Sequence, residues 1–219
     1  MTVHDCPRCG FAGPEDWFKQ RLPRRIRKLV RENLAPLPRD QGARFWRKIE
    51  HAAQIAQWQA KPPREIADLY LKAAYVCAGG NPEYRTSIRI EDEKSNRLRA
   101  IEFFRRSLEA GDVPAAEVPR ITYLVGELYR RVARESDAHA WLERAEALAK
   151  DRGIQWLVEL SRQQRTDPQD IFENPPLSLF VTGERHASPA SVSDPDGVFK
   201  VWQGDDMDDI FNVWRGDRQ

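Results

Sequence analysis

Residues 121–149 read ITYLVGELYRRVARESDAHAWLERAEALA, and the spacing of small and apolar residues in this stretch decides the fold. Apolar residues recur three or four positions apart on both sides of residues 133–137, which predicts two amphipathic helices joined by a short turn. Five positions match the 34-residue tetratricopeptide signature: Gly126, Tyr129, Ala138, Leu142 and Ala145. The alternative is an ordinary helical bundle whose small residues allow close packing.

The packing inside this helix pair can also be predicted from the signature. Gly126 and Ala138 are expected to let the two helices approach each other closely. Three large side chains are expected to fill the interface: Tyr129, Trp141 and Leu142. Ser136 precedes the second apolar series and is expected to cap that helix.

The same helical spacing extends toward the N-terminus. Apolar series predict further helices around residues 26–33, 45–56, 66–77 and 98–108, with a polar connection from Asn81 to Lys94. No segment alternates with a period of two, so we expect almost no sheet. The predicted fold class is all-α, with tetratricopeptide-like helical hairpins, a short zinc-knuckle-like N-terminal turn and a flexible acidic C-terminal tail.

The charge distribution divides the chain into regions, although the 219 residues carry a net charge of only +1. Residues 1–64 hold 14 basic and 6 acidic residues, whereas residues 166–219 hold 4 basic and 11 acidic residues. Together with the apolar spacing and the cysteine motif described below, these shifts predict a zinc-knuckle-like turn at 1–18, basic helices at 19–64, helical hairpins at 65–165 and an acidic, largely disordered tail at 166–219. The chain has no long apolar run, no signal-peptide pattern and three cysteines, so we expect a soluble cytoplasmic protein that does not contact membranes.

The stretch Cys6-Pro7-Arg8-Cys9-Gly10 has the form of a zinc knuckle, in which two thiolates reach one metal ion across a tight turn. A structural zinc site needs four ligands, and the chain contains only one further cysteine, Cys77, on the inner face of a predicted helix. The missing ligands must come from histidine, for which His4 and His51 are candidates, or from a partner chain; otherwise the turn binds no metal. The predicted cofactor is therefore zinc with an incomplete ligand set in one chain. The alternatives are a metal-free vestige and a redox dithiol.

A basic run follows the cysteine turn and comprises Lys19, Arg21, Arg24, Arg25, Arg27, Lys28 and Arg31. Such a run can neutralise nucleic-acid phosphates. It can equally be a solvated helix face, or a surface on which the acidic tail or another acidic segment docks. No aromatic residues are interleaved for base stacking.

The tail repeats one motif at a period of 12 residues, aliphatic-Phe-x-Val-Trp-x-Gly-Asp, at residues 198–205 and 210–217. Apolar anchors on a short segment can dock into the groove of a protein partner. The predicted partner-binding residues are Phe199, Val201, Trp202, Phe211, Val213 and Trp214. The alternative is a terminal hairpin that packs on the helical body.

Catalytic residues are not predicted. The four histidines fall on different predicted elements, and no nucleophile motif or glycine-rich phosphate loop is present. An acid or base role for Glu127 has little support, because this residue follows Gly126 on an ordinary helix.

Several segments together resemble a bacterial family of uncharacterised proteins, the domain of unknown function numbered 2225. They are VHDCPRCGFAGPEDWF at 3–18, EIADLYLKAAY at 65–75, AIEFF at 100–104 and YLVGELYRR at 123–131. This resemblance covers residues 3–165 and implies a zinc-ribbon-like start joined to tetratricopeptide-like helices, with no established activity.

The sequence therefore favours a non-enzymatic adaptor that binds protein partners through a helical groove and a bivalent tail. The alternative function is nucleic-acid binding by the basic N-terminal helix, with the acidic tail as an internal competitor. Homo-oligomers are compatible with either function.

Overall fold

The computed structural model describes residues 3–37, 41–78 and 87–168. The chain divides into two compact units, with the boundary between Asp112 and Val113. This boundary falls inside the predicted 65–165 segment. Among the described residues, no helix is both long and apolar enough to cross a membrane.

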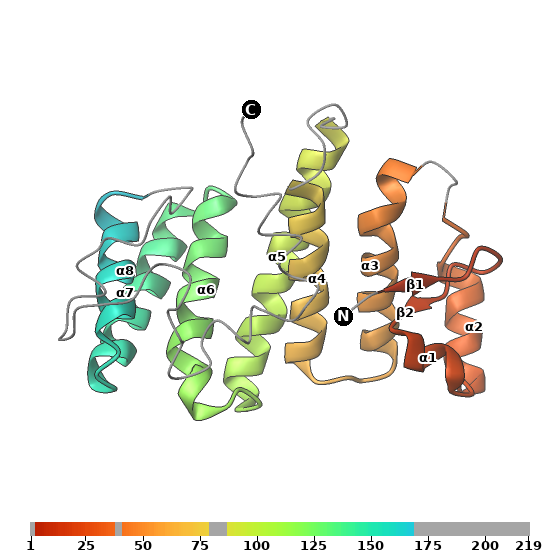
Figure 1. The fold of residues 1–219 in the computed structure, drawn as a ribbon, viewed down its shortest axis with the longest axis horizontal. Coiled ribbons are helices and arrows are strands. Elements are labelled where there is room, and N and C mark those ends of the chain that lie inside the picture. The colour runs from red at the N-terminus through yellow and green to blue at the C-terminus, as the bar shows by residue number, and fades with distance from the viewer. Residues whose placement is uncertain (1–2, 38–40, 79–86, 169–219) are drawn as a thin grey trace, which may run out of the picture. The chain divides into compact units, whose positions relative to one another are not determined.

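The N-terminal unit begins with a small antiparallel hairpin, in which β1 (His4–Asp5) pairs with β2 (Ala12–Gly13). Two short helices follow, α1 (Glu15–Lys19) and α2 (Arg24–Asn33), shown in red in Figure 1. Pro23 precedes α2, where its missing N–H costs no helical hydrogen bond. One buried apolar cluster joins the hairpin, α2 and the next helix, and its members are Phe11, Ile26, Val30 and Ile55.

Three longer helices complete this unit: α3 (Gln41–Trp58), α4 (Pro63–Ala78) and α5 (Ser87–Ala110). Helix α4 packs against both α3 and α5 (Figure 1). Alanines without exposed surface line these contacts, which lets the helix backbones approach closely: Ala52, Ala53, Ala56, Ala73, Ala74 and Ala100. The Tyr70 ring of α4 stacks on Phe103 of α5, with 5.9 Å between the ring centroids.

The predicted connection from Asn81 to Lys94 is wrong in its second half, because α5 already begins at Ser87. The first turns of α5 carry no apolar stripe, and polar contacts hold them instead. The indole Nε1 of Trp46 on α3 donates to Asp92, at 3.0 Å, and Arg97 donates one turn back to Glu93. Polar contacts thus connect the first turns of α5 to α3 and to the next turn of α5 itself.

The C-terminal unit contains a 3₁₀ turn η2 (Ala115–Glu117) and three helices, α6 (Val118–Arg131), α7 (Glu135–Asp151) and α8 (Gln155–Thr166). Helix α7 packs against both α6 and α8. Gly126 lies where α6 meets α7, and a Cβ atom there would be 2.8 Å from Leu142 Cγ and 3.0 Å from the Leu142 backbone nitrogen. The close approach predicted at Gly126 is therefore present.

One detail of the predicted hairpin is wrong. Ser136 does not cap α7, because the helix begins at Glu135 and Arg134 occupies the N-cap without a side-chain capping bond. Leu142 and Tyr129 are buried as predicted, whereas Trp141 is half-buried. The Arg144 guanidinium lies 5.2 Å from the centroid of the Trp141 ring.

The described part of the chain confirms the predicted helical class. The described residues contain eight α-helices, and the two strands of the hairpin contain two residues each. The predicted flexible acidic tail lies outside the described residues, except for residues 166–168.

Candidate functional site

The cysteine turn, residues 6–10, lies at the tip of the β1–β2 hairpin. Two backbone hydrogen bonds close it, from Cys6 N to Phe11 O at 2.7 Å and from Gly10 N to Cys6 O at 3.1 Å. Gly10 has a φ of +73°, and a Cβ atom on it would lie 2.3 Å from the carbonyl oxygen of Ala35. Only glycine fits this conformation and this space, as the knuckle motif predicts.

The two thiols of the turn influence each other's pKa. The backbone N–H groups of Arg8 and Cys9 and the positive charge of Arg8 together lower the pKa of Cys6. Burial raises the pKa of Cys9, and the neighbouring Cys6 adds to this effect. Neither cysteine is in a disulfide, and both are half-buried while Pro7 and Arg8 between them are exposed. The turn therefore makes Cys6 easier to deprotonate than Cys9.

His51 on α3 braces the turn from behind. Its Nδ1 lies 2.8 Å from the carbonyl oxygen of Gly10, and because a carbonyl only accepts, Nδ1 carries the proton. Burial lowers the pKa of His51, so the ring is neutral near pH 7. The histidine thus fixes the position of Gly10 and holds the turn against α3.

The other predicted ligand candidates do not join the two cysteines. His4 is exposed on β1, and Cys77 is buried in α4. Over residues 3–37, 41–78 and 87–168, no three His, Cys, Asp or Glu side chains are grouped closely enough to hold a metal ion. Within the described residues, the turn offers two thiols and no third ligand.

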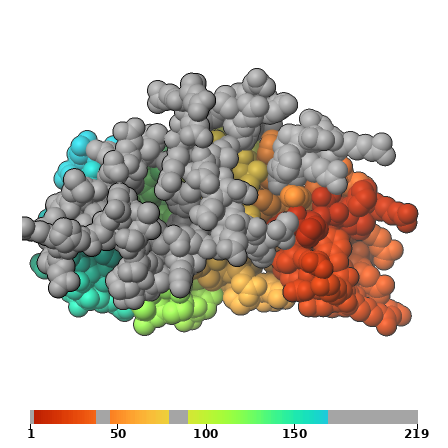
Figure 2. Space-filling view, viewed as in Figure 1, coloured from red at the N-terminus to blue at the C-terminus, as the bar shows by residue number. Residues whose placement is uncertain are grey.

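Helix α2 presents a basic outer surface directly after the turn. Its inner face buries Ile26 and Val30, and the half-buried Leu29 packs against the same apolar cluster. Five basic side chains are exposed and form what we call the basic face of α2: Arg24, Arg25, Arg27, Lys28 and Arg31. Figure 2 shows the N-terminal residues of this unit in red.

Part of the predicted basic run is paired with nearby groups. Lys19 forms ion pairs with Glu15 at 2.9 Å and Asp16 at 3.5 Å, and Lys28 lies 3.8 Å from Glu32. These pairs are exposed and weak, so the basic face of α2 keeps its excess of positive charge. Phosphates or carboxylates of a partner could bind there.

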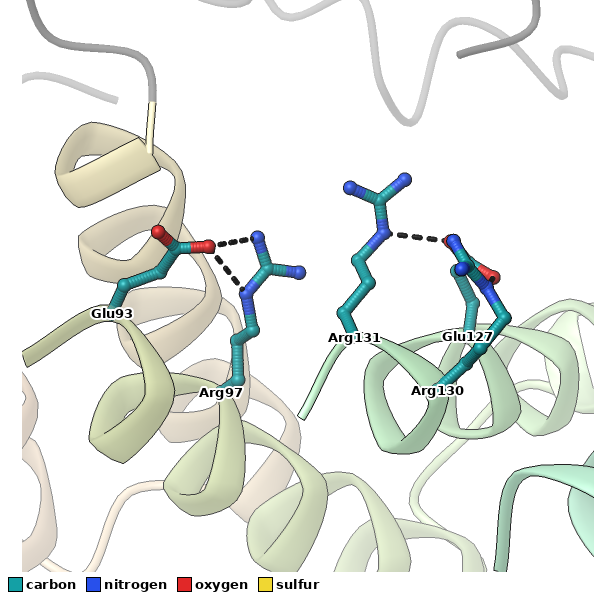
Figure 3. A network of polar contacts seen from close by, with 5 residues as sticks. All are labelled: Glu93, Arg97, Glu127, Arg130 and Arg131. Carbon is teal, nitrogen blue, oxygen red and sulfur yellow. Dashed lines mark hydrogen bonds and ion pairs between the residues drawn. The ribbon is translucent and has the colours of Figure 1, made fainter. Parts of the chain in front are cut away.

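Glu127 is part of a structural ion cluster on α6. Its carboxylate accepts from Arg130 Nε and Nη2 at 2.9 and 2.8 Å and from Arg131 Nε at 2.7 Å (Figure 3). The residue is only 8% exposed, and both its oxygens are occupied. This arrangement supports a structural role for Glu127, consistent with the low expectation of acid or base chemistry.

A buried polar cluster between α3 and α5 escaped the sequence analysis. Asn96 Nδ2 donates to the Glu50 carboxylate at 2.7 Å, and Asn96 is 1% exposed. Burial raises the pKa of Glu50. Glu50 is the single glutamate of α3, and its position among apolar residues could have marked it as unusual. The sequence does not show that its partner is Asn96, 46 positions later.

The predicted anchors of the tail lie outside the described residues. They are Phe199, Val201, Trp202, Phe211, Val213 and Trp214.

Comparison with known proteins gave one match. Residues 1–167 match the model of a family described as an uncharacterized protein conserved in bacteria, DUF2225. No curated protein and no solved structure matches the chain.

Proposed function

The chain belongs to the DUF2225 family of uncharacterized bacterial proteins, and we propose that it is a non-enzymatic adaptor. In this proposal, the helical hairpins hold one protein partner and the duplicated tail motif captures another. The observation that carries the proposal is the repeat of aliphatic-Phe-x-Val-Trp-x-Gly-Asp at residues 198–205 and 210–217.

The helical part supports the proposal through its packing. Gly126 lies directly against Leu142, and Ala138 and Ala145 are buried in the same α6–α7 hairpin. These are the positions at which tetratricopeptide repeats place their small residues, and α8 packs on α7 as the first helix of a next repeat would. Stacked helical pairs of this kind expose extended surfaces that bind peptides and proteins.

Duplication of the tail motif supports bivalent capture. The two copies are 12 residues apart, so when one copy binds, the second is held at an effective concentration in the millimolar range. About 30 residues separate the end of α8 from the first copy. Two weak contacts could therefore hold one partner together.

The test is affinity capture from a lysate of the bacterium that makes the protein. The bait is the full chain, compared with W202A, W214A and W202A/W214A. The matched control is Q203A/R215A, which changes the two variable positions directly after the tryptophans. We expect the single variants to retain less of one specific protein, the double variant to lose it, and the control to keep it. Equal retention by the double variant and the full chain would refute the proposal.

A second candidate function is nucleic-acid binding, and the exposed basic face of α2 is the observation that favours it. If all five side chains contact phosphates, log K should fall against log salt with a slope of about −4 to −5. Because the tail is acidic, a chain ending at Arg165 should bind labelled DNA or RNA more tightly than the full chain. If the shortened chain binds neither at low salt, this candidate is excluded.

A further inference from the structure

The contact between α3 and α5 contains a buried amide oxygen that lacks a hydrogen-bond donor. Asn96 on α5 is 1% exposed, and its Nδ2 donates to Oε1 of Glu50 on α3 at 2.7 Å. Among the described residues, its Oδ1 is buried and has no hydrogen-bond partner. An unpaired buried acceptor destabilises the folded state, so a donor is needed beside this oxygen.

The carboxyl group of Glu50 can supply that donor when it is protonated. A protonated carboxyl group and a primary amide each offer a donor and an acceptor side by side, so two hydrogen bonds can close a ring between them. In this ring Asn96 Nδ2 donates to Glu50 Oε1, as observed, and the Glu50 hydroxyl donates to Asn96 Oδ1. The ionised carboxylate has no donor, so it leaves Asn96 Oδ1 unpaired.

Titratable and charged groups from three helices face Glu50. Arg47 of α3 lies 3.4 Å from the Asp92 carboxylate of α5. Arg99 of α5 donates to the Tyr70 hydroxyl of α4 at 3.3 Å. Each arginine thus has a partner other than Glu50, and Asp92 brings a second carboxylate to the same contact.

These surroundings favour the protonated form of Glu50. Burial raises the pKa of Glu50, and the charge of Asp92 adds to this effect. Three groups oppose it, namely Asn96 through its hydrogen bond, and Arg47 and Arg99 through their charges, and the pKa remains above its usual value. The hairpin and α2 pack on α3 through other residues, among them His51 and Ile55.

We propose that Glu50 and Asn96 form this acid–amide ring, that the ring fastens the first half of α5 to α3, and that loss of the Glu50 proton loosens this half of the helix. Glu50 is half-buried, so its proton can pass to solvent as one O–H bond breaks, without electron transfer. The ionised carboxylate then repels that of Asp92 across the contact.

The second half of α5 is held by apolar packing and provides an internal reference. Phe104 has no exposed surface, and the Phe103 ring stacks on Tyr70 of α4. These contacts do not depend on the Glu50 proton. The N-terminal unit thus contains a proton-sensitive contact that tightens in acid and loosens as pH rises. This inference is independent of the adaptor proposal, because no residue of the tail takes part in the ring.

The test is amide-resolved hydrogen exchange on the full chain, wild type and E50Q, from about pH 5 to about pH 8. Glutamine keeps both hydrogen bonds at every pH, because its Nε2 can donate to Asn96 Oδ1 while its Oε1 accepts. Intrinsic exchange rates and the titration of His51 are common to both proteins and cancel in the ratio of their rates. For amides 89–96, the ratio of wild type to E50Q should rise by up to about tenfold per pH unit above the Glu50 pKa.

Two comparisons make this result specific. Amides 101–110 should show a smaller rise than amides 89–96. E91Q is the matched control, because Glu91 is an exposed glutamate in the same half of α5, and E91Q should show the same rise relative to E50Q as wild type does. A ratio that stays constant with pH, or an equal rise in both halves of α5, would overturn the proposal.

A direct titration separates the ring from burial alone and does not depend on E50Q. The side-chain carboxyl carbon of Glu50 is followed by NMR against pH in isotope-labelled wild type and N96A. In wild type its midpoint should lie above the usual glutamate range. N96A should leave the midpoint unchanged or lower it, because the ring gives two hydrogen bonds to the acid and one to the anion. A midpoint that rises in N96A would mean that Asn96 serves only the anion, which would overturn the ring.

Discussion

Replacing Gly126 with alanine tests whether the α6–α7 hairpin depends on a glycine contact. Alanine is favoured over glycine inside a helix by about 1 kcal/mol, so an isolated α6 would gain stability from this change. In the folded hairpin, the new methyl carbon would lie 2.8 Å from Leu142 Cγ and 3.0 Å from the Leu142 backbone nitrogen. Overpacking of this kind costs about 1–3 kcal/mol.

The two effects have opposite signs, and we expect the steric one to win. G126A should lower the free energy of unfolding by up to about 2 kcal/mol, the difference between the overpacking cost and the propensity gain. The assay is urea unfolding followed by circular dichroism, with hydrogen exchange of the α6 and α7 amides to assign the loss to this hairpin.

A double-mutant cycle with L142A sharpens the test. Leu142 is 1% exposed, so L142A alone should cost about 2–5 kcal/mol. In the G126A background its cost should be smaller by about 1–3 kcal/mol, because L142A removes the contact with the Leu142 side chain and the new methyl group fills part of the cavity. The reasoning would be refuted if G126A stabilised the protein by its full helix propensity and the two changes were additive.

Three further predictions concern buried groups of the N-terminal unit. Because burial lowers the pKa of His51, the unfolded state takes up a proton before the folded state does as pH falls. Stability should therefore fall as pH drops below about 6.5. His51→Asn keeps an N–H donor toward the turn and should make the urea midpoint of unfolding less dependent on pH in this range. Burial raises the pKa of Glu50, so the folded protein favours the protonated carboxyl group and loses stability as pH rises through that pKa. E50Q, which still accepts a hydrogen bond from Asn96, should therefore gain stability relative to wild type between pH 4 and pH 7. G10A should cost more than about 1–2 kcal/mol in thermal unfolding, because it adds a clash with Ala35 to the left-handed strain.

Local patterns in the sequence were enough to predict the α6–α7 hairpin. Gly126, Ala138 and Leu142 lie at fixed spacings, and each spacing reports a contact between helices adjacent in the chain. The turn at Gly10 was predictable for the same reason, since a glycine after CPxC indicates a tight turn with positive φ.

Features that depend on distant residues were missed. The start of α5 at Ser87 is held by contacts such as Trp46 to Asp92, which join positions 46 residues apart. The buried Glu50–Asn96 pair has the same separation. Periodicity reports only which face of a helix is apolar, so a polar contact between α3 and α5 leaves no local signal.

The candidate site was predictable in its parts and not in its arrangement. Cys6 and Cys9 followed from their spacing, whereas the role of His51 as a brace depends on α3 packing behind the hairpin. The sequence left His51 as a ligand candidate, because sequence alone does not distinguish a histidine that binds a metal from one that donates to a backbone carbonyl.

Peptide competition tests the adaptor proposal most directly. A partner captured on the immobilised full chain is challenged with a peptide of residues 196–219, with the same peptide carrying W202A/W214A, and with one copy of the motif. The proposal predicts that the two-copy peptide releases the partner, that the single copy requires at least tenfold higher concentration, and that the alanine peptide releases none. The proposal would be contradicted if the alanine peptide released the partner at the same concentration, or if none of the peptides released it.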